Sequence, residues 1–153
     1  MKHILLTIVC CIGMVNHAAG QNSAESAVDQ VLSNFHLYAS QGDWNPYFAL
    51  MSEDAIFLGT DAGERWTKSE FEGFARATSG WTYAKTARHI KLLPDSETAW
   101  FDELLWNDSY GECRGSGVLV KQDGQWLIAQ YNLSIPIPNA LARQITDLIK
   151  QQP

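Results

Sequence analysis

The sequence predicts an α+β domain in which helices come first and a long, curved antiparallel sheet follows. Two observations lead to this prediction. Apolar residues recur at helical spacing in the first half of the chain, whereas from Trp81 onward they occur in long runs rich in β-branched and aromatic residues. Asp123-Gly124 separates two of these runs, and this dipeptide favours the left-handed angles of a two-residue hairpin turn.

The chain is expected to form two helices before its first strand. An apolar stripe over residues 23–40 predicts an amphipathic helix, which Gly42 ends. Asp43 is expected to cap a short second helix that runs through Met51. A short strand over residues 55–58 follows, because the chain there is apolar and ends at a glycine-containing turn.

A third helix is expected after the turn Gly59-Thr60-Asp61. Thr67 and Glu70 match a capping box, in which each side chain accepts a hydrogen bond from the backbone amide of the other residue. The residues behind this box give the helix one buried stripe, formed by Phe71, Phe74, Ala75 and Thr78.

Four long strands, separated by short polar turns, are expected at residues 81–93, 98–107, 114–122 and 126–135. The short links between neighbouring strands predict an antiparallel meander. Helices that close only one end of such a strongly bent sheet would leave a cone with an open mouth. Pro138-Asn139 is expected to stop the last strand and cap a terminal helix, whose apolar stripe is Leu141, Ile145, Leu148 and Ile149.

Residues 1–20 are expected to be a cleaved secretory signal. They combine a basic start at Lys2, an apolar core over residues 4–15 and the small residues Ala18-Ala19-Gly20 before a cut at Gln21. The apolar core is shorter than the roughly 20 residues that cross a bilayer. We therefore expect an exported protein, periplasmic or extracellular, whose single domain covers residues 21–153 and which has no membrane contact after cleavage.

Composition argues against several classes of function. The formal net charge of −6 argues against binding to nucleic acid or to anionic membranes, which require clustered lysines and arginines. The sequence has no spaced Cys and His cluster and no glycine-rich phosphate loop, so we expect no metal and no cofactor. Aromatic residues make up 11% of the chain, including six Trp, and this suits either a thick core or a lined cavity.

Three segments together resemble the SnoaL-like domains of the nuclear transport factor 2-like superfamily, and the match covers essentially the whole mature chain. They read FLGTDAGERWTKSEF, AWFDELLW and RGSGVLVKQDGQWLIAQYNLSIPIPN. The resemblance implies a cone-shaped barrel with a deep pocket between sheet and helices, and a homodimer that pairs through the outer sheet face. The superfamily includes ketosteroid isomerases, polyketide cyclases, dehydratases and epoxide hydrolases, so the fold alone does not decide the chemistry. Relatives often carry a His where this chain has Asn132.

Asp102 and Glu103 are the candidates for a general base. They are neighbours in the middle of a predicted strand, so their side chains point to opposite faces and only one enters the cone. Hydropathy does not choose between them, because both faces carry large apolar residues. The inward carboxylate would have a pKa raised by desolvation, as a base near neutral pH needs. Alternatively, it pairs with Arg88 or Arg114 and holds the sheet together.

Tyr131 on the last strand is a candidate proton donor to a developing oxyanion, or else a buried aromatic residue. Asp61 or Trp66 is expected at the pocket rim, unless Asp61 only binds the amides of its own turn. His89 could shuttle protons if it faces inward. Asn132 belongs to a polar row that would face a wet cavity or a dimer interface. The candidate ligand-binding residues are thus Asp61, Trp66, His89, Trp100, Arg114 and Asn132.

Three hypotheses follow. The first is a dimeric, exported domain that binds a small, largely apolar molecule. The second is a cofactor-free isomerase or cyclase, with Asp102 or Glu103 as base and Tyr131 or Arg114 as oxyanion partner. The third is a protein-interaction module that works through its outer sheet face.

Overall fold

The structure is a computed structural model of the 153-residue chain, and it describes residues 4–94 and 97–151, with side chains from residue 22 onward. The expected signal peptide, residues 1–20, lies outside the part whose side chains are described. No helix within the described part is long and apolar enough to cross a membrane.

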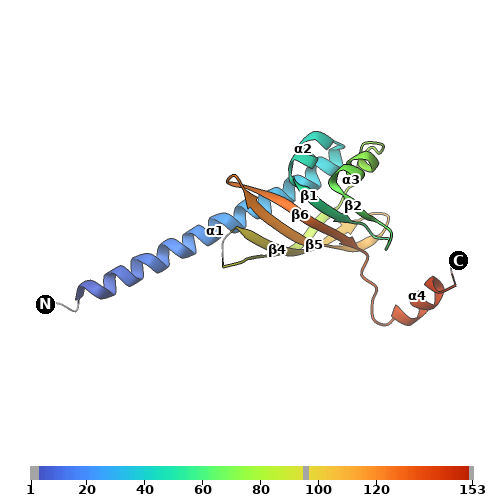
Figure 1. Ribbon diagram of the computed structural model, residues 1–153. Coiled ribbons are helices and arrows are strands. Elements are labelled where there is room, and N and C mark those ends of the chain that lie inside the picture. Colours follow the sequence, from blue (N-terminus) through green and yellow to red (C-terminus); the bar gives the residue numbers. More distant parts are fainter. Residues whose placement is uncertain (1–3, 95–96, 152–153) are drawn as a thin grey trace.

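In the described part of the chain, four helices and six strands form the predicted α+β fold (Figure 1). The helices are α1 (Ile4–Gln41), α2 (Trp44–Ala49), α3 (Lys68–Ala75) and α4 (Ala142–Ile149). The strands are β1 (Met51–Leu58), β2 (Arg65–Thr67), β3 (Ala84–Leu92), β4 (Thr98–Asn107), β5 (Gly111–Gln122) and β6 (Gln125–Ser134). All strands belong to one sheet with the order β2-β1-β6-β5-β4-β3.

The second half of the sheet is the expected antiparallel meander of β3, β4, β5 and β6. Asp123 and Gly124 have φ angles of 50° and 80°, so the hairpin turn between β5 and β6 has the predicted left-handed geometry. β1 extends the sheet by pairing parallel to β6, and β2 pairs antiparallel to β1. This places β1, which precedes the meander in the chain, beside β6, the last strand of the meander.

The core lies between α1 and the concave face of the sheet. Buried residues of α1 recur at the predicted helical spacing and are Val28, Leu32, Phe35 and Ala39. They belong to one cluster with buried residues of the meander, among them Phe101, Leu119, Ile128 and Tyr131. Helices α2 and α3 contact each other and lie over one end of the sheet (Figure 1). Helices α1, α2 and α3 thus cover one face of the sheet and leave the other face open (Figure 1).

The first half departs from the prediction in two places. The second helix ends at Ala49 rather than at Met51, because Met51 begins β1 and the carbonyl of Leu50 accepts a hydrogen bond of 2.8 Å from the amide of Ile128. Pairing with a strand distant in sequence therefore overrides the local helical pattern. The short strand β2 was not expected, and it places Trp66 opposite Phe57 of β1.

Two further differences concern the end of the chain. The alternation of faces along β6 is interrupted at Ala129, because Gln130 pairs with Val118 whereas Ile128 pairs with Leu119. This bulge lets Ile128 and Tyr131, three residues apart, both point into the core. The terminal helix α4 forms, but Asn139 does not cap it, and none of its residues is buried.

Candidate functional site

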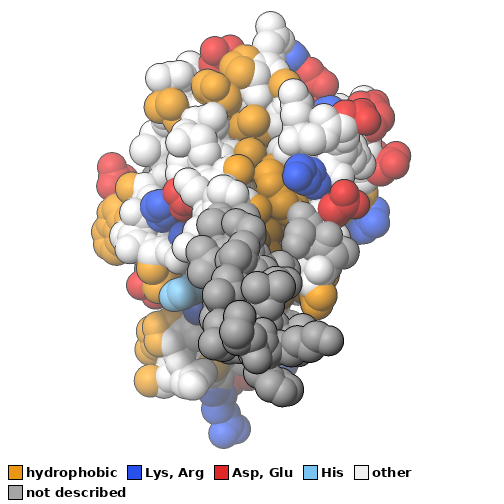
Figure 2. Space-filling model, turned by 90° about the vertical axis from the view of Figure 1, so that its left-hand side faces the viewer, with side chains coloured by type: hydrophobic (Ala, Val, Ile, Leu, Met, Phe, Trp, Pro, Cys, Tyr) orange, Lys and Arg blue, Asp and Glu red, His pale blue; other side chains and the backbone are white. Residues whose placement is uncertain are grey.

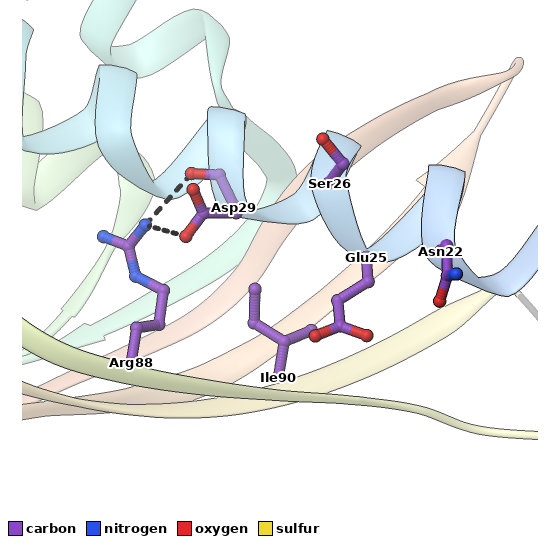
Figure 3. A pocket seen from close by; sticks show the side chains of 6 residues that line it. All are labelled: Asn22, Glu25, Ser26, Asp29, Arg88 and Ile90. Atoms are coloured by element: carbon purple, nitrogen blue, oxygen red, sulfur yellow. Dashed lines mark hydrogen bonds and ion pairs between the residues drawn. The ribbon is translucent and has the colours of Figure 1, made fainter.

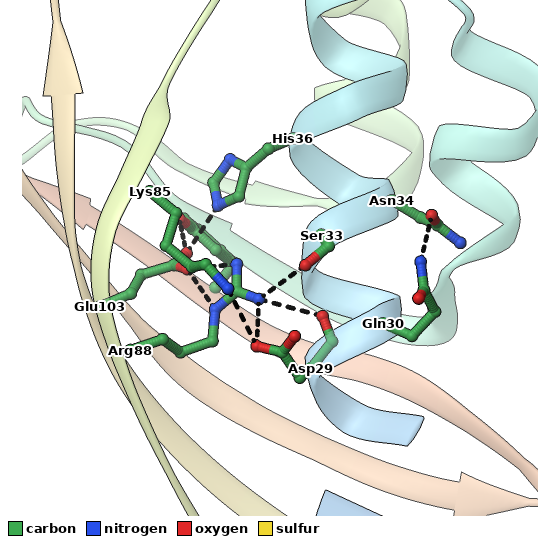
Figure 4. A network of polar contacts seen from close by, with 9 residues as sticks. Asp29, Gln30, Ser33, Asn34, His36, Lys85, Arg88 and Glu103 are labelled. Atoms are coloured by element: carbon green, nitrogen blue, oxygen red, sulfur yellow. Dashed lines mark hydrogen bonds and ion pairs between the residues drawn. The ribbon is translucent and has the colours of Figure 1, made fainter. Parts of the chain in front are cut away.

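A buried carboxylate, Glu103, lies at the centre of a polar network between α1 and the sheet (Figure 4). One oxygen, Oε1, lies 2.8 Å from His36 Nε2 and accepts a hydrogen bond of 2.8 Å from the Tyr131 hydroxyl. The other, Oε2, accepts a hydrogen bond of 2.7 Å from Arg88 Nε. Because an ionised carboxylate only accepts hydrogen bonds, His36 Nε2 must carry the proton it shares with Oε1. The hydrogen-bonding capacity of Glu103 is thus met within the protein.

Arg88 extends the network from the sheet to the backbone and side chains of α1. Its Nη1 donates to the carbonyl and the carboxylate of Asp29, at 3.0 and 2.8 Å, and to Ser33 Oγ at 3.0 Å. Lys85 adds an exposed ion pair to Asp29 at 3.3 Å. The network therefore joins α1 to β3 and β4 through one buried guanidinium group.

Local sequence spacing explains why these groups meet. Asp29, Ser33 and His36 are four and three residues apart on α1, so they form one polar stripe beside the apolar stripe of the same helix. In the sheet, Arg88 lies directly opposite Glu103 in the pairing of β3 with β4. The stripe and the pair face each other across the core.

The pKa of Glu103 is lowered, although a raised pKa was expected for an inward carboxylate. Burial raises it, but the hydrogen bond and electrostatic attraction of His36, the charge of Arg88 and the hydrogen bond from Tyr131 lower it by more. Burial and the negative charge of Glu103 hold the pKa of Tyr131 well above its usual range. Glu103 is therefore a stable anion and Tyr131 a neutral donor.

Gly115 on β5 makes room for the contact between Glu103 and Tyr131. A Cβ atom at this position would collide with the Tyr131 hydroxyl and lie 2.8 Å from Glu103 Oε1. Gly115 is not among the residues that the sequence singled out for this site. The side chains that it accommodates come from the two neighbouring strands, β4 and β6, so its local sequence carries no signal of this role.

A second feature is an aromatic cavity of about 220 Å³ between α3 and the ends of β1, β2 and β6. Six aromatic residues from these elements and from the segment before β3 line it: Phe57, Trp66, Phe71, Phe74, Trp81 and Tyr83. The rings of Trp66 and Phe71 are nearly parallel, with centroids 5.6 Å apart, and those of Trp66 and Phe74 are 5.0 Å apart. Tyr110 and Leu133 complete the apolar lining.

The polar groups of the aromatic cavity are few. Thr60 and Glu64 contribute them from the turn between β1 and β2. Burial, together with the nearby Cys113 and Tyr110, raises the pKa of Tyr83 to about 12, so its hydroxyl stays protonated at neutral pH. The cavity therefore offers aromatic walls, one carboxylate and neutral hydroxyl groups.

The polar network and the aromatic cavity are neighbours but do not open into each other. Phe57 lines the cavity, and its ring stacks on that of Tyr131 with centroids 5.6 Å apart and planes at 5°. Neither Tyr131 nor Glu103 is among the lining residues. A molecule in the cavity would thus meet the side chain of Phe57 rather than the carboxylate of Glu103.

The structure separates the residues that the sequence singled out. Glu103 and Tyr131 meet inside the core, and Trp66 lines the aromatic cavity. Asp61 lies in its exposed turn and accepts a hydrogen bond of 2.7 Å from the amide of Gly63. The other candidates lie on the outer face of the sheet, away from the core: His89, Trp100, Asp102, Arg114 and Asn132.

On that outer face, Asp102 forms a contact of 3.2 Å with His89 Nδ1, and both side chains are exposed. Asp102, Ser116 and Asn132 lie in register across β4, β5 and β6. The polar row expected along β6, formed by Gln130, Asn132 and Ser134, lies on this same outer face and points away from the cavity.

A shallow groove of about 360 Å³ runs between α1 and β3 (Figure 3). Arg88 and Asp29 form one end of it, and Glu25, Ser26, Asn22 and Ile90 line the rest.

On the face shown in Figure 2, lysines and arginines are scattered among acidic and hydrophobic side chains. Within the described part of the chain, no three His, Cys, Asp or Glu side chains gather as metal ligands would.

Comparison with known proteins agrees with this architecture. The family of SnoaL-like domains matches residues 28–138. No curated protein sequence matches the chain. Among solved structures, a nuclear transport factor 2-like protein of unknown function from Pseudomonas putida KT2440 superposes with a TM-score of 0.65 at 15% identity, covering 77% of this chain and 90% of that one.

Two further structures have the same fold. A candidate scytalone dehydratase from Novosphingobium aromaticivorans superposes with a TM-score of 0.66 at 12% identity, covering 78% of this chain and 89% of its own. A nuclear transport factor 2-like protein from Cytophaga hutchinsonii has a TM-score of 0.63 at 12% identity, with 72% and 97% covered. At these identities the likeness shows the fold alone.

Proposed function

This chain belongs to the SnoaL-like domain family, and on that premise we propose that it binds a small, largely apolar molecule in the aromatic cavity. The observation that carries the proposal is the cavity itself, about 220 Å³ of space walled by aromatic rings from five different segments. Small-ligand sites are typically concave, mostly apolar and provided with a few placed polar groups. This cavity has all three properties.

The cavity volume and wall geometry restrict the ligand. Pockets for drug-sized molecules usually measure about 300–1,000 Å³, so a cavity of about 220 Å³ fits a smaller molecule of one or two rings. Trp66, Phe71 and Phe74 present nearly parallel rings, which favour a flat ligand that stacks in the same orientation. A flat aromatic molecule is therefore the expected class.

The test is a titration of 2-naphthol into isotope-labelled protein, followed by the NMR signals of the tryptophan side chains. Saturable shifts are expected at Trp66 and Trp81, which line the cavity, and not at the exposed Trp100. Trp66→Ala should weaken binding about tenfold, since an aromatic stacking partner contributes roughly 1 kcal/mol beyond its buried area. Trp100→Ala is the matched control and should bind like the parent. Equal weakening by both variants would contradict the proposal.

The geometry gives less support to a cofactor-free isomerase or cyclase with Glu103 as base and Tyr131 as oxyanion partner. Both oxygens of Glu103 are occupied by hydrogen bonds, and neither residue lines the aromatic cavity. A general base must reach the proton it removes, directly or through one water molecule. Here His36 or Tyr131 would first have to move away from Glu103.

We propose in addition that the outer sheet face forms a homodimer, which also accounts for the third hypothesis of an interaction surface. Trp100 and Trp106 on this face are 46% and 52% exposed. Exposed large aromatic side chains are enriched in protein interfaces. The mass in solution tests this, and replacing both tryptophans by serine should yield monomers.

Export is likewise a proposal, and N-terminal sequencing of the mature protein should find Gln21 first.

A further inference from the structure

We propose that the ligand of the aromatic cavity is an organic cation, an ammonium group attached to a flat apolar body. The proposal rests on the cavity being the binding site, and it goes further by naming the chemical class. Its basis is one carboxylate, Glu64, held at the edge of an otherwise aromatic lining.

Glu64 is the charged residue of the cavity lining, and its position is fixed by the turn that carries it. Its carbonyl accepts a hydrogen bond of 2.9 Å from Gly59, and its amide donates one of 3.0 Å to the carbonyl of Asp61. Its carboxylate oxygen Oε2 accepts a hydrogen bond of 3.1 Å from the amide of Asp61. A Cβ atom at residue 59 would collide with Oε2, so Gly59 makes room for this carboxylate. The carboxylate is therefore held in place before a ligand arrives.

This carboxylate has no cationic partner among the residues whose side chains are described. Neighbouring glutamates differ in this respect, because Glu53 pairs with Lys68 and Glu72 with Arg76. A neutral ligand that filled the cavity would displace water from the carboxylate of Glu64 without offering a charged partner in its place. Such a loss of hydration is unfavourable for a charged group. A cationic ligand supplies the missing partner.

The aromatic walls suit the same charge. Tryptophan gives the strongest attraction between a cation and a ring face, and Trp66 and Trp81 both line the cavity. Tyr83 remains a neutral phenol, because its pKa is about 12. The lining includes no lysine or arginine from the described residues, so no group there would repel a cation or hold an anion.

The charge of the whole chain acts in the same direction. With a net charge of −6, the protein attracts cations from a distance and raises their concentration near its surface. The carboxylate, the aromatic walls and the net charge are separate observations, and each favours a cation over a neutral or anionic ligand.

The test compares phenyltrimethylammonium with its neutral isostere tert-butylbenzene on the full mature chain, by NMR titration at low ionic strength. We expect the cation to bind at least tenfold more tightly. Glu64→Gln should bring the two affinities to within about twofold, whereas Glu112→Gln, which removes an exposed carboxylate outside the cavity, should leave the preference unchanged. Added salt should weaken binding of the cation and not of the isostere, which tests the inference in the parent protein as well.

The outcomes separate this inference from the proposed function. Equal affinity for the two probes overturns the cationic ligand and leaves an apolar binding site. A preference that survives Glu64→Gln also overturns it, because the selectivity then arises elsewhere. Binding of neither probe, together with no binding of 2-naphthol, overturns both proposals.

Discussion

Asp102 and Glu103 are consecutive residues with opposite environments. Glu103 is fully buried and held by Arg88, His36 and Tyr131, whereas Asp102 is exposed beside His89. Strand alternation predicted that the two would point to opposite faces, but not which of them would point inward. That choice depends on the polar stripe of α1. His36 of this stripe, which contacts Glu103, lies 67 residues before it in the chain.

Replacing Glu103 by Gln should destabilise the protein strongly. The buried guanidinium of Arg88 would lose its buried anionic partner and keep only the more exposed Asp29, and removing one partner of a buried ion pair typically costs about 3–5 kcal/mol. Asp102→Asn is the matched control on the adjacent residue, and it should change the free energy of unfolding by no more than about 0.5 kcal/mol. Urea denaturation of both variants measures the difference. Similar values for the two would show that the network contributes little to stability.

At the scale of elements, sequence patterns predicted the features that depend only on neighbouring residues. The capping box of Thr67 and Glu70 forms at the start of α3, and the turn at Asp123-Gly124 joins β5 to β6. The patterns failed where a distant partner decides. Met51 enters a strand because it pairs with Ile128, and β2 forms because β1 offers an edge.

Helix α4 forms without any buried residue, so its removal should cost little. Ending the chain after Ile137 deletes α4 and its linker, and we expect the free energy of unfolding to change by less than about 0.5 kcal/mol. Leu32→Ala in α1 provides the contrast. Because Leu32 is fully buried, this substitution should lower the free energy of unfolding by about 2–5 kcal/mol. Urea denaturation measures both. A loss above about 1 kcal/mol on truncation would mean that α4 packs against another surface in solution.

At the scale of the whole molecule, the fold class and the cone were predictable, because the periodicity of apolar residues shows the order of helical and β-rich segments. Apart from Trp66, the residues that line the aromatic cavity were not predictable, since they come from β1, β2, α3, β6, the segment before β3 and the turn between β4 and β5. Phe71 and Phe74 were expected as a buried stripe, but only Phe71 is buried, whereas Phe74 is 50% exposed. Both side chains border the cavity. The pairing of the inward carboxylate with Arg88 was one of the two predicted alternatives, and it forms. The part of the network that lies on α1 was missed for a similar reason. His36 shares a stripe with Asp29 and Ser33, and that spacing was the available signal.

The stability of the whole molecule should fall as the pH becomes acidic. The pKa of Glu103 is lowered from its usual 4.5, because His36, Arg88 and Tyr131 together outweigh its burial. The pKa of Asp29 is lowered from its usual 3.8, because Arg88 and Lys85 outweigh burial. The unfolded chain therefore binds protons at a higher pH than the folded protein does. The stability from these groups is complete above the unfolded pKa values and is lost as the pH falls through the folded ones.

Urea midpoints between pH 7 and pH 3 measure this dependence. The urea midpoint of the parent protein should be nearly constant near neutral pH. It should fall below about pH 4.5, where glutamate in the unfolded chain takes up its proton. Glu103→Gln should start from a lower value and decline less steeply, because it lacks one of the titrating groups, while Asp102→Asn should keep the steepness of the parent. A buried carboxylate with a raised pKa would behave in the opposite way, since the folded state would then take up its proton first. A parent protein that becomes more stable between pH 6 and pH 4 would therefore show that Glu103 is not the stabilised anion of the network.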